Sequence, residues 1–259
     1  MIVSRTRMAP GHGALVTNWG DLYGEPVPGR RCGADVALAP EEHEPSGPVG
    51  EGGRARRALH PERWAEIVDA AGEEFDEKGY AAARIEDIAA RVGLLKGSLY
   101  YYIESKEDLL FAIVDGDHDR GIAVIEESAA LDLAEPAVRL GDFITRWTGI
   151  LAANRGYSSV SERDLRRLSP DRQAIVMAKR FRIHRFVREI IERGIAEGHF
   201  HADVDPGVAT NSLFEMLNGV SHWFHPSRPL SYDELAEHLR CFVLRGLGVD
   251  PAAYGPVPT

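Results

Sequence analysis

Apolar residues recur at helical spacing along most of the chain from residue 61 onward. Trp64, Val68, Ala71 and Phe75 follow one another at intervals of four, three and four residues, which places them on one face of a helix. The same reasoning, with Pro, Gly and Ser marking helix ends, predicts further helices. We place the helices at about 61–78, 85–92, 96–103, 106–130, 136–154, 162–168, 170–198, 205–224 and 232–247. No stretch shows a convincing strand pattern, so the predicted fold is all-α.

Residues 1–53 lack any such period, and residues 1–60 contain ten glycines and six prolines. A segment of this kind buries too little apolar surface to offset the entropy of ordering it. We therefore interpret 1–53 as a disordered tail, or as upstream sequence that does not belong to the native protein. The remaining predicted parts are an N-terminal helical domain over 54–110, a C-terminal helical domain over 111–250, and a short tail over 251–259.

The first three predicted helices are short, and a turn containing Gly93 joins the second to the third, as in a helix-turn-helix unit. Within the third helix, Leu99 and Ile103 are four residues apart and share the core-facing side. Tyr101 then lies almost opposite the core, with Gly97 beside it. Three consecutive tyrosines at 100–102 cannot all point into one core, because neighbouring helix residues point in different directions.

An outward glycine beside an outward tyrosine favours close approach to a rigid partner. Lys96 and Ser98 lie at the start of the third helix, and Lys106 lies in the first turn of the next helix. Cationic side chains and free backbone N–H groups at these helix starts can bind phosphates. The predicted partner is therefore double-stranded DNA, with the third helix in its major groove. The alternative interpretation is an exposed aromatic patch used for association with another protein.

The segment "FDEKGYAAARIEDIAARVGLLKGSLYYYIESKEDLLFAIVD", residues 75–115, resembles the DNA-binding domain of TetR-type transcriptional regulators. The resemblance covers about 62–115, with its signature in Gly79-Tyr80, Asp87-Ile88-Ala89, Gly93, Lys96 to Tyr100 and Ser105-Lys106-Glu107. It implies a homodimeric, ligand-responsive regulator, usually a repressor, whose C-terminal helices hold an effector. It also implies DNA contacts by Lys96, Gly97, Ser98, Tyr100, Tyr101, Tyr102 and Lys106.

Two positions depart from the family pattern. Arg84 stands where the family usually has a hydroxyl residue capping the second helix, and Leu95 replaces a serine before the third. Leucine cannot cap a helix, a loss of ~1 kcal/mol. Arg84 has the reach to contact a phosphate, with a plain surface arginine as the alternative. Arg57 belongs to an arginine-rich arm that could reach the minor groove or phosphates, or could be a solvated linker.

The formal net charge is −10, which in bulk argues against nucleic acid, so the DNA interpretation depends on local geometry alone. The two cysteines are far apart and make neither a disulfide framework nor a zinc site. No apolar run is long enough to cross a membrane and no signal peptide is visible, so we expect a cytoplasmic protein.

The C-terminal half contains the residues that we expect to bind an effector. Projection at ~100° per residue places Lys179 and Arg180 on the same helix face as the apolar stripe of Val176, Ile183 and Val187. A buried cation is unfavourable unless it meets an anion, although both side chains could instead extend to water at the edge of the bundle. Segments 191–209 and 218–235 resemble regulators of lipid and sterol catabolism that respond to acyl-CoA thioesters. We therefore expect an amphipathic anion such as an acyl-CoA thioester, whose phosphates meet the surrounding arginines. The expected ligand-binding residues are Trp147, Lys179, Arg180, Ile183, Phe214 and Trp223.

The last two helices carry long apolar stripes that could pair with a second copy, giving a homodimer, or could complete the monomer core.

His222 and His225 are the best candidate metal ligands, but no established metal or catalytic motif accompanies them, so we expect no metal, no cofactor and no catalytic residues. Two alternatives to a DNA-binding regulator stay open. One is a helical small-molecule-binding protein or enzyme with a vestigial DNA-binding domain, and the other is a protein-binding adaptor.

Overall fold

The computed structural model describes residues 60–224 and 230–254, and all regular secondary structure in these ranges is helical. The predicted tail over 1–53, Arg57 and His225 lie outside the described residues, and so does the side chain of His222. The α-helices are α3 (Pro61–Lys78), α4 (Ile85–Arg91), α5 (Lys96–Leu99), α6 (Lys106–Ala130), α7 (Pro136–Ala153), α8 (Arg155–Asp164), α9 (Pro170–Ala196), α10 (Pro206–Trp223) and α11 (Tyr232–Gly246). Two 3₁₀ turns follow α8 and α11, η1 (Leu165–Arg167) and η2 (Pro251–Ala253). The all-α prediction is confirmed.

Most helix ends agree with the sequence signals. Pro61, Pro136, Pro170 and Pro206 each occupy the first turn of a helix, where the missing N–H has no partner to lose. Asp108 in the first turn of α6 accepts hydrogen bonds from the N–H groups of Glu104 (2.7 Å) and Ser105 (3.3 Å), as the predicted capping box requires.

Two helix predictions were wrong in extent. The helix expected over 96–103 is α-helical only to Leu99. Beyond it the N–H groups of Tyr101 and Tyr102 bond three residues back, to Ser98 and Leu99, so the chain tightens into turns. The helix expected over 162–168 begins earlier, because α8 starts at Arg155 directly after α7. Asn154 ends α7 and precedes α8, a helix-to-helix corner with no Gly or Pro between the two helices to mark it.

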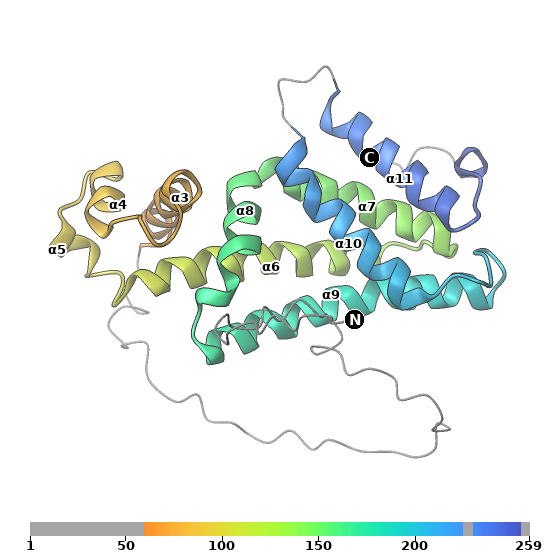
Figure 1. The fold of residues 1–259 in the computed structure, drawn as a ribbon, viewed down its shortest axis with the longest axis horizontal. Helices are drawn as coiled ribbons and strands as arrows, with labels where there is room; N and C mark the ends of the chain where they lie inside the picture. The colour runs from red at the N-terminus through yellow and green to blue at the C-terminus, as the bar shows by residue number, and fades with distance from the viewer. Residues whose placement is uncertain (1–59, 225–229, 255–259) are drawn as a thin grey trace, which may run out of the picture. The chain divides into compact units, whose positions relative to one another are not determined.

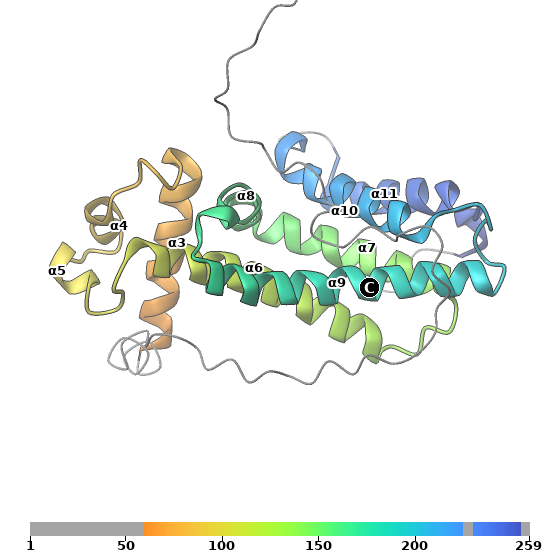
Figure 2. The ribbon, with the colours of Figure 1, turned by 60° about the horizontal axis from the view of Figure 1, so that its bottom comes forward.

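Helix α6 connects the short helices α3, α4 and α5 to the bundle of helices that follows. Figure 1 shows α3, α4 and α5 at the end where α6 begins, while α8 crosses α6, and α7 and α9 pack against the rest of it. In Figure 2, α6 and α9 run side by side. Ion pairs connect these two helices at successive levels, including Lys179 with Asp115 (2.5 Å) and Arg182 with Glu126 (2.8 Å).

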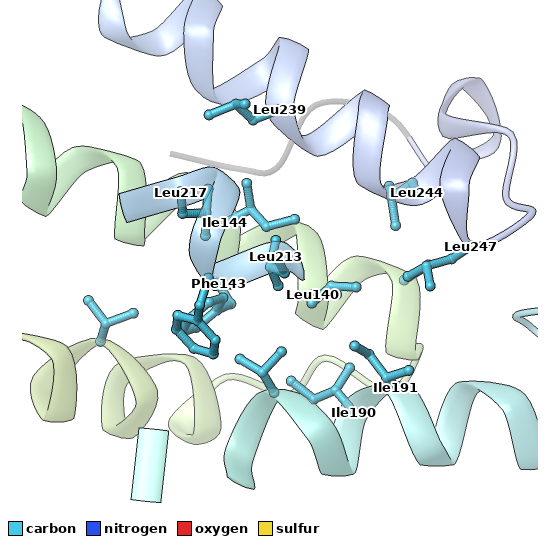
Figure 3. Close-up of a cluster of buried hydrophobic side chains, with 14 of the residues drawn as sticks. Leu140, Phe143, Ile144, Ile190, Ile191, Leu213, Leu217, Leu239, Leu244 and Leu247 are labelled. Atoms are coloured by element: carbon cyan, nitrogen blue, oxygen red, sulfur yellow. The ribbon is translucent and has the colours of Figure 1, made fainter. Parts of the chain in front are cut away.

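Two apolar clusters hold the helices together. One surrounds Phe75, Ile88, Leu99 and Ile113 and also includes Val176 of α9, so the helix-turn-helix unit shares its core with the helices that follow. The other fills the bundle of α6, α7, α9, α10 and α11, with Phe143, Ile190 and Leu217 among its members (Figure 3). No described helix has the length and apolar character needed to span a membrane.

Candidate DNA-binding surface and effector cavity

Leu99 and Ile103 face the core and Tyr101 faces solvent, as the projection predicted. Leu99 and Ile103 are buried against α3, α4 and α6, whereas Tyr100 and Tyr101 expose 45% and 46% of their surface. Tyr102 is half-buried and its ring meets that of Tyr101 edge to face, with centroids 5.5 Å apart. Two phenol rings therefore stand outward beside α5, braced by a third.

The first turn of α5 presents a small, open surface. Gly97 is exposed, and a Cβ added there would meet no atom within 4 Å. Ser98 is exposed beside it. Lys96 forms an ion pair with Glu86 of α4 at 2.5 Å, and this hydrogen bond raises the pKa of the Lys96 ammonium. Both charges of this pair are half-exposed and lie at the rim of the surface formed by α4 and α5.

Lys106 forms hydrogen bonds with the loop between α3 and α4. Its Nζ donates to the carbonyl oxygens of Tyr80 (2.6 Å) and Ala83 (3.0 Å) and lies 4.5 Å from the centre of the Tyr80 ring. Burial, together with Arg167, lowers the pKa of Lys106. A phosphate contact by Lys106 stays a prediction, because the structure gives its ammonium acceptors within the chain.

Arg84 immediately precedes α4 and is exposed, and its side chain makes no capping hydrogen bond. Glu86, the partner of Lys96, lies two residues further along in the first turn of α4. The phosphate contact of Arg84 also stays a prediction.

A cavity of about 50 Å³ lies in the bundle between α6, α7, α8, α9 and α10. Four of the six expected ligand-binding residues line it: Trp147, Arg180, Ile183 and Phe214. Trp147 stacks on Phe143 and meets Phe214 edge to face, so the apolar wall is built from aromatic rings. The buried indole Nε1 of Trp147 has no hydrogen-bond acceptor among the described residues.

Two expected ligand residues lie elsewhere. Lys179 points to α6, where Asp115 and Asp119 accept from its ammonium at 2.5 and 2.6 Å. Trp223 is half-exposed near the end of α10 and lines a separate surface hollow with α11. Neighbouring arginines are likewise engaged by carboxylates, as in the pairs of Arg167 with Asp164 and Arg172 with Asp108, and they do not gather at the cavity. Contact of these arginines with the phosphates of an effector stays a prediction.

The polar wall of the cavity was missed by the sequence analysis. It contains Asp117, His118, Ser158, Glu162 and His184, with Ser158 Oγ donating to Asp117 Oδ1 at 2.9 Å. Burial lowers the pKa of both histidines, and the pKa of His184 falls to about 4, helped by nearby Arg180 and His118. The signal that could have revealed this wall is the polar spacing of Ser158, Ser161 and Glu162 on one face of α8.

The cavity helices also contact α3 of the helix-turn-helix unit directly. On α8, the residue before Ser158 is Tyr157, whose hydroxyl donates to Asp69 of α3. Arg163, near the end of the same helix, donates to the carbonyl oxygen of Phe75 at 2.7 Å. One short helix therefore touches both the cavity and α3.

Comparison with known proteins identifies the architecture. Residues 67–113 match the family described as "Bacterial regulatory proteins, tetR family", and residues 134–247 match "Tetracyclin repressor-like, C-terminal domain". The TetR-family transcriptional regulator PfmR from Thermus thermophilus is 31% identical, with a TM-score of 0.65 over 70% of this chain and 98% of that one. The chain belongs to the TetR family.

Other TetR-family proteins are similar over the same extent. The transcriptional repressor KstR2 of Rhodococcus jostii is 25% identical over 185 residues, which are 71% of this chain and 91% of that protein. The structure of AibR in complex with isovaleryl coenzyme A and operator DNA is 25% identical, with a TM-score of 0.59 over 70% of this chain and 97% of that one. The protein is thus a TetR-type DNA-binding transcriptional regulator and not an enzyme, and the hypothesis of a vestigial DNA-binding domain is not favoured.

Proposed function

We propose that this TetR-family protein acts as a homodimeric repressor, which binds a palindromic operator through α5 and releases it when an acyl-CoA thioester occupies the bundle cavity. The observation that supports DNA binding best is the outward face of α5. There, Gly97 leaves open space and Tyr100 and Tyr101 project into solvent, while Leu99 anchors the turn in the core. Residues 54–110 would form the DNA-binding domain and residues 111–250 the effector and dimerisation domain.

In the proposed complex, α5 enters the major groove and the tyrosines and Ser98 donate to phosphates or base edges. Lys96, Arg84 and Arg57 supply positive charge at the groove walls. Binding of Lys96 to a phosphate would exchange its partner Glu86 for a phosphate oxygen. The local geometry outweighs the overall charge of −10, because DNA contacts only this end of the molecule.

The DNA proposal is tested by selecting binding sites from a random duplex library with the full chain. A palindromic consensus, bound with nanomolar affinity and lost in Tyr101→Ala, is the expected result. Recovery of no sequence preference would contradict the proposal.

The homodimer would form through α10 and α11, which leave large apolar side chains in solvent. Val208 and Phe242 expose 65% and 70% of their surface, and Phe242 borders hollows of about 460 and 790 Å³ on both sides. A second copy related by a two-fold axis would place the same apolar face in these hollows, as isologous contacts do. Two copies would also present two α5 segments to the two halves of a palindrome.

Dimerisation is measured by light scattering or sedimentation velocity. The variant Phe242→Asp is expected to be monomeric or to dissociate at micromolar concentration, because it places a charge in the apolar contact. The matched control is Phe181→Asp, on the exposed side of α9, where Phe181 is 51% exposed. A Phe242→Asp protein that stays dimeric would remove α11 from the interface.

The effector proposal rests on the chemistry of the cavity walls and on the ligand named for AibR. The rings of Trp147 and Phe214 with Ile183 suit an acyl chain, and the Trp147 indole N–H is available to a carbonyl oxygen. A volume of about 50 Å³ holds only a few water-sized groups, so a short acyl chain fits without rearrangement. Asp117 and Glu162 disfavour phosphates inside the cavity, so in this proposal the coenzyme lies outside it, with Arg180 as the lining cation that its phosphates would meet.

Operator release is titrated with acyl-CoAs of increasing chain length, with coenzyme A alone, with free carboxylic acids and with neutral apolar compounds. Short acyl-CoAs are expected to release the operator, and Trp147→Phe is expected to raise the concentration needed by about tenfold, since one hydrogen bond to the carbonyl is lost. Lys179→Ala is the control, because Lys179 lies outside the cavity. Release by neutral compounds with acyl-CoAs inert would contradict the effector assignment.

A further inference from the structure

Leu95 projects into solvent immediately before α5. It exposes 80% of its surface, the largest fraction among the big apolar side chains that the described residues leave exposed. Its backbone is nevertheless fixed, because its carbonyl oxygen accepts hydrogen bonds from the N–H groups of Ser98 (2.9 Å) and Leu99 (3.2 Å). The side chain is therefore held outward by an ordered turn.

The core does not use this side chain. Leu94 packs against the apolar cluster of the helix-turn-helix unit and Leu99 is fully buried in it, so the two neighbouring apolar positions already fill the core. A single exposed leucine is common on protein surfaces and carries no meaning by itself. What distinguishes Leu95 is its location at the start of α5, in an unbroken stretch of exposed residues from Leu95 to Ser98 that includes Gly97.

The position of Leu95 decides what it could contact. In helix-turn-helix proteins the residues at the start of the recognition helix meet base edges. A leucine side chain neither donates nor accepts hydrogen bonds. The apolar group that base edges offer in the major groove is the C5-methyl group of thymine. The open surface at Gly97 permits the approach, because a Cβ there would meet nothing within 4 Å.

We propose that Leu95 contacts a thymine C5-methyl group in each half of the operator and so selects a T·A pair at that position. This inference depends on the proposed entry of α5 into the major groove. It also predicts that 5-methylcytosine, which carries the same methyl group at the same ring position, supports the contact when it replaces cytosine in a C·G pair.

The test uses the operator selected with the full chain. Each thymine of a half-site is replaced in turn by uracil, which removes the methyl group and keeps the base pairing, and affinity is measured by fluorescence anisotropy. One position is expected to lose about fourfold in affinity per half-site, corresponding to one methyl group of ~0.8 kcal/mol, and about fifteenfold when both halves are changed. At that position, cytosine should bind weakly and 5-methylcytosine should restore part of the affinity.

The variant Leu95→Ala assigns the effect. It is expected to bind the thymine and uracil operators equally at that one position and to keep the wild-type response to uracil elsewhere. Leu131→Ala, an exposed leucine after α6, should keep the full uracil effect at every position. The inference is overturned if the wild type ignores uracil at every thymine, or if Leu95→Ala retains the same penalty. Failure to select any operator would instead contradict the proposed function.

Discussion

Arg172, in the first turn of α9, forms an ion pair with Asp108, in the first turn of α6, and the two side chains expose only 18% and 3% of their surface. Beside this pair, Glu107 Oε1 accepts a hydrogen bond from the N–H of Ser169 at 2.8 Å. The start of α9 is thereby joined to the start of α6, three residues after Ile103. Two turns further along α9, about 12 Å away, Arg180 lines the cavity. The ion pair therefore connects the helix that lines the cavity to the base of the DNA-binding unit.

The pair predicts a dependence of stability on pH. Burial would raise the pKa of Asp108, but the N–H of Glu104 and the guanidinium of Arg172 outweigh it, and the pKa of Asp108 lies below its usual value. A lowered pKa in the folded state stabilises the protein above the unfolded value of about 4, and this stabilisation is lost as pH falls below it. Urea unfolding between pH 2.5 and 7 should therefore show a shallower acid loss in Asp108→Asn than in the wild type.

Removal of the cation tests the pair from the other side. Arg172→Met leaves Asp108 buried without its partner and should lower the free energy of unfolding at pH 7 by about 3–5 kcal/mol. Arg193→Met, on the exposed end of the same helix, is the control and should change it by less than about 1 kcal/mol. If Arg172→Met lowered the free energy of unfolding by no more than about 1 kcal/mol, as expected for the control, the Arg172 pair would add nothing to stability.

His184 predicts a second effect of pH, in a different range. Burial, Arg180 and His118 lower the pKa of His184 to about 4, so protonation disfavours the folded state. Stability should be complete above the unfolded pKa of about 6.5 and fall as pH decreases toward 4, by up to about 3 kcal/mol. His184→Phe keeps a ring stacked on Phe214 and should flatten the unfolding free energy between pH 6.5 and 4. An unchanged slope would assign the effect to another group.

Tyr101 and Leu99 should separate DNA binding from folding, because one points outward and the other into the core. Tyr101→Ala is expected to lose most operator affinity while its melting temperature stays within a few degrees of the wild type. Leu99→Ala should lower the free energy of unfolding by ~2–5 kcal/mol, since it leaves a cavity in the apolar cluster. Anisotropy and thermal melting measure the two effects, and normal operator affinity in Tyr101→Ala would contradict the proposed DNA-binding surface.

Lys106 is expected to contribute to folding through its carbonyl acceptors and to DNA binding through its charge. Lys106→Met leaves the carbonyl groups of Tyr80 and Ala83 without this donor, a loss of about 1–3 kcal/mol in unfolding free energy. A phosphate contact would also reduce the slope of log affinity against log salt by about one unit per half-site. Lys106→Arg keeps the charge and should keep the slope. A slope unaffected by Lys106→Met would leave Lys106 a purely structural residue.

Local signals in the sequence determined the helical fold, most helix ends and the outward face of α5. Helix caps and apolar periodicity depend on residues within a turn or two of one another, so Ser105, Pro170 and the pair Leu99 and Ile103 could be interpreted without the tertiary structure. Tertiary structure alone decided the extent of α5, the start of α8, the carbonyl acceptors of Lys106 and the walls of the cavity. Lys179 and Arg180 are adjacent on one helix, yet Asp115 and Asp119 on α6 engage the first, while the second lines the cavity. That difference depends on how α6 and α9 pack, and packing between distant segments leaves no periodic signal in either segment.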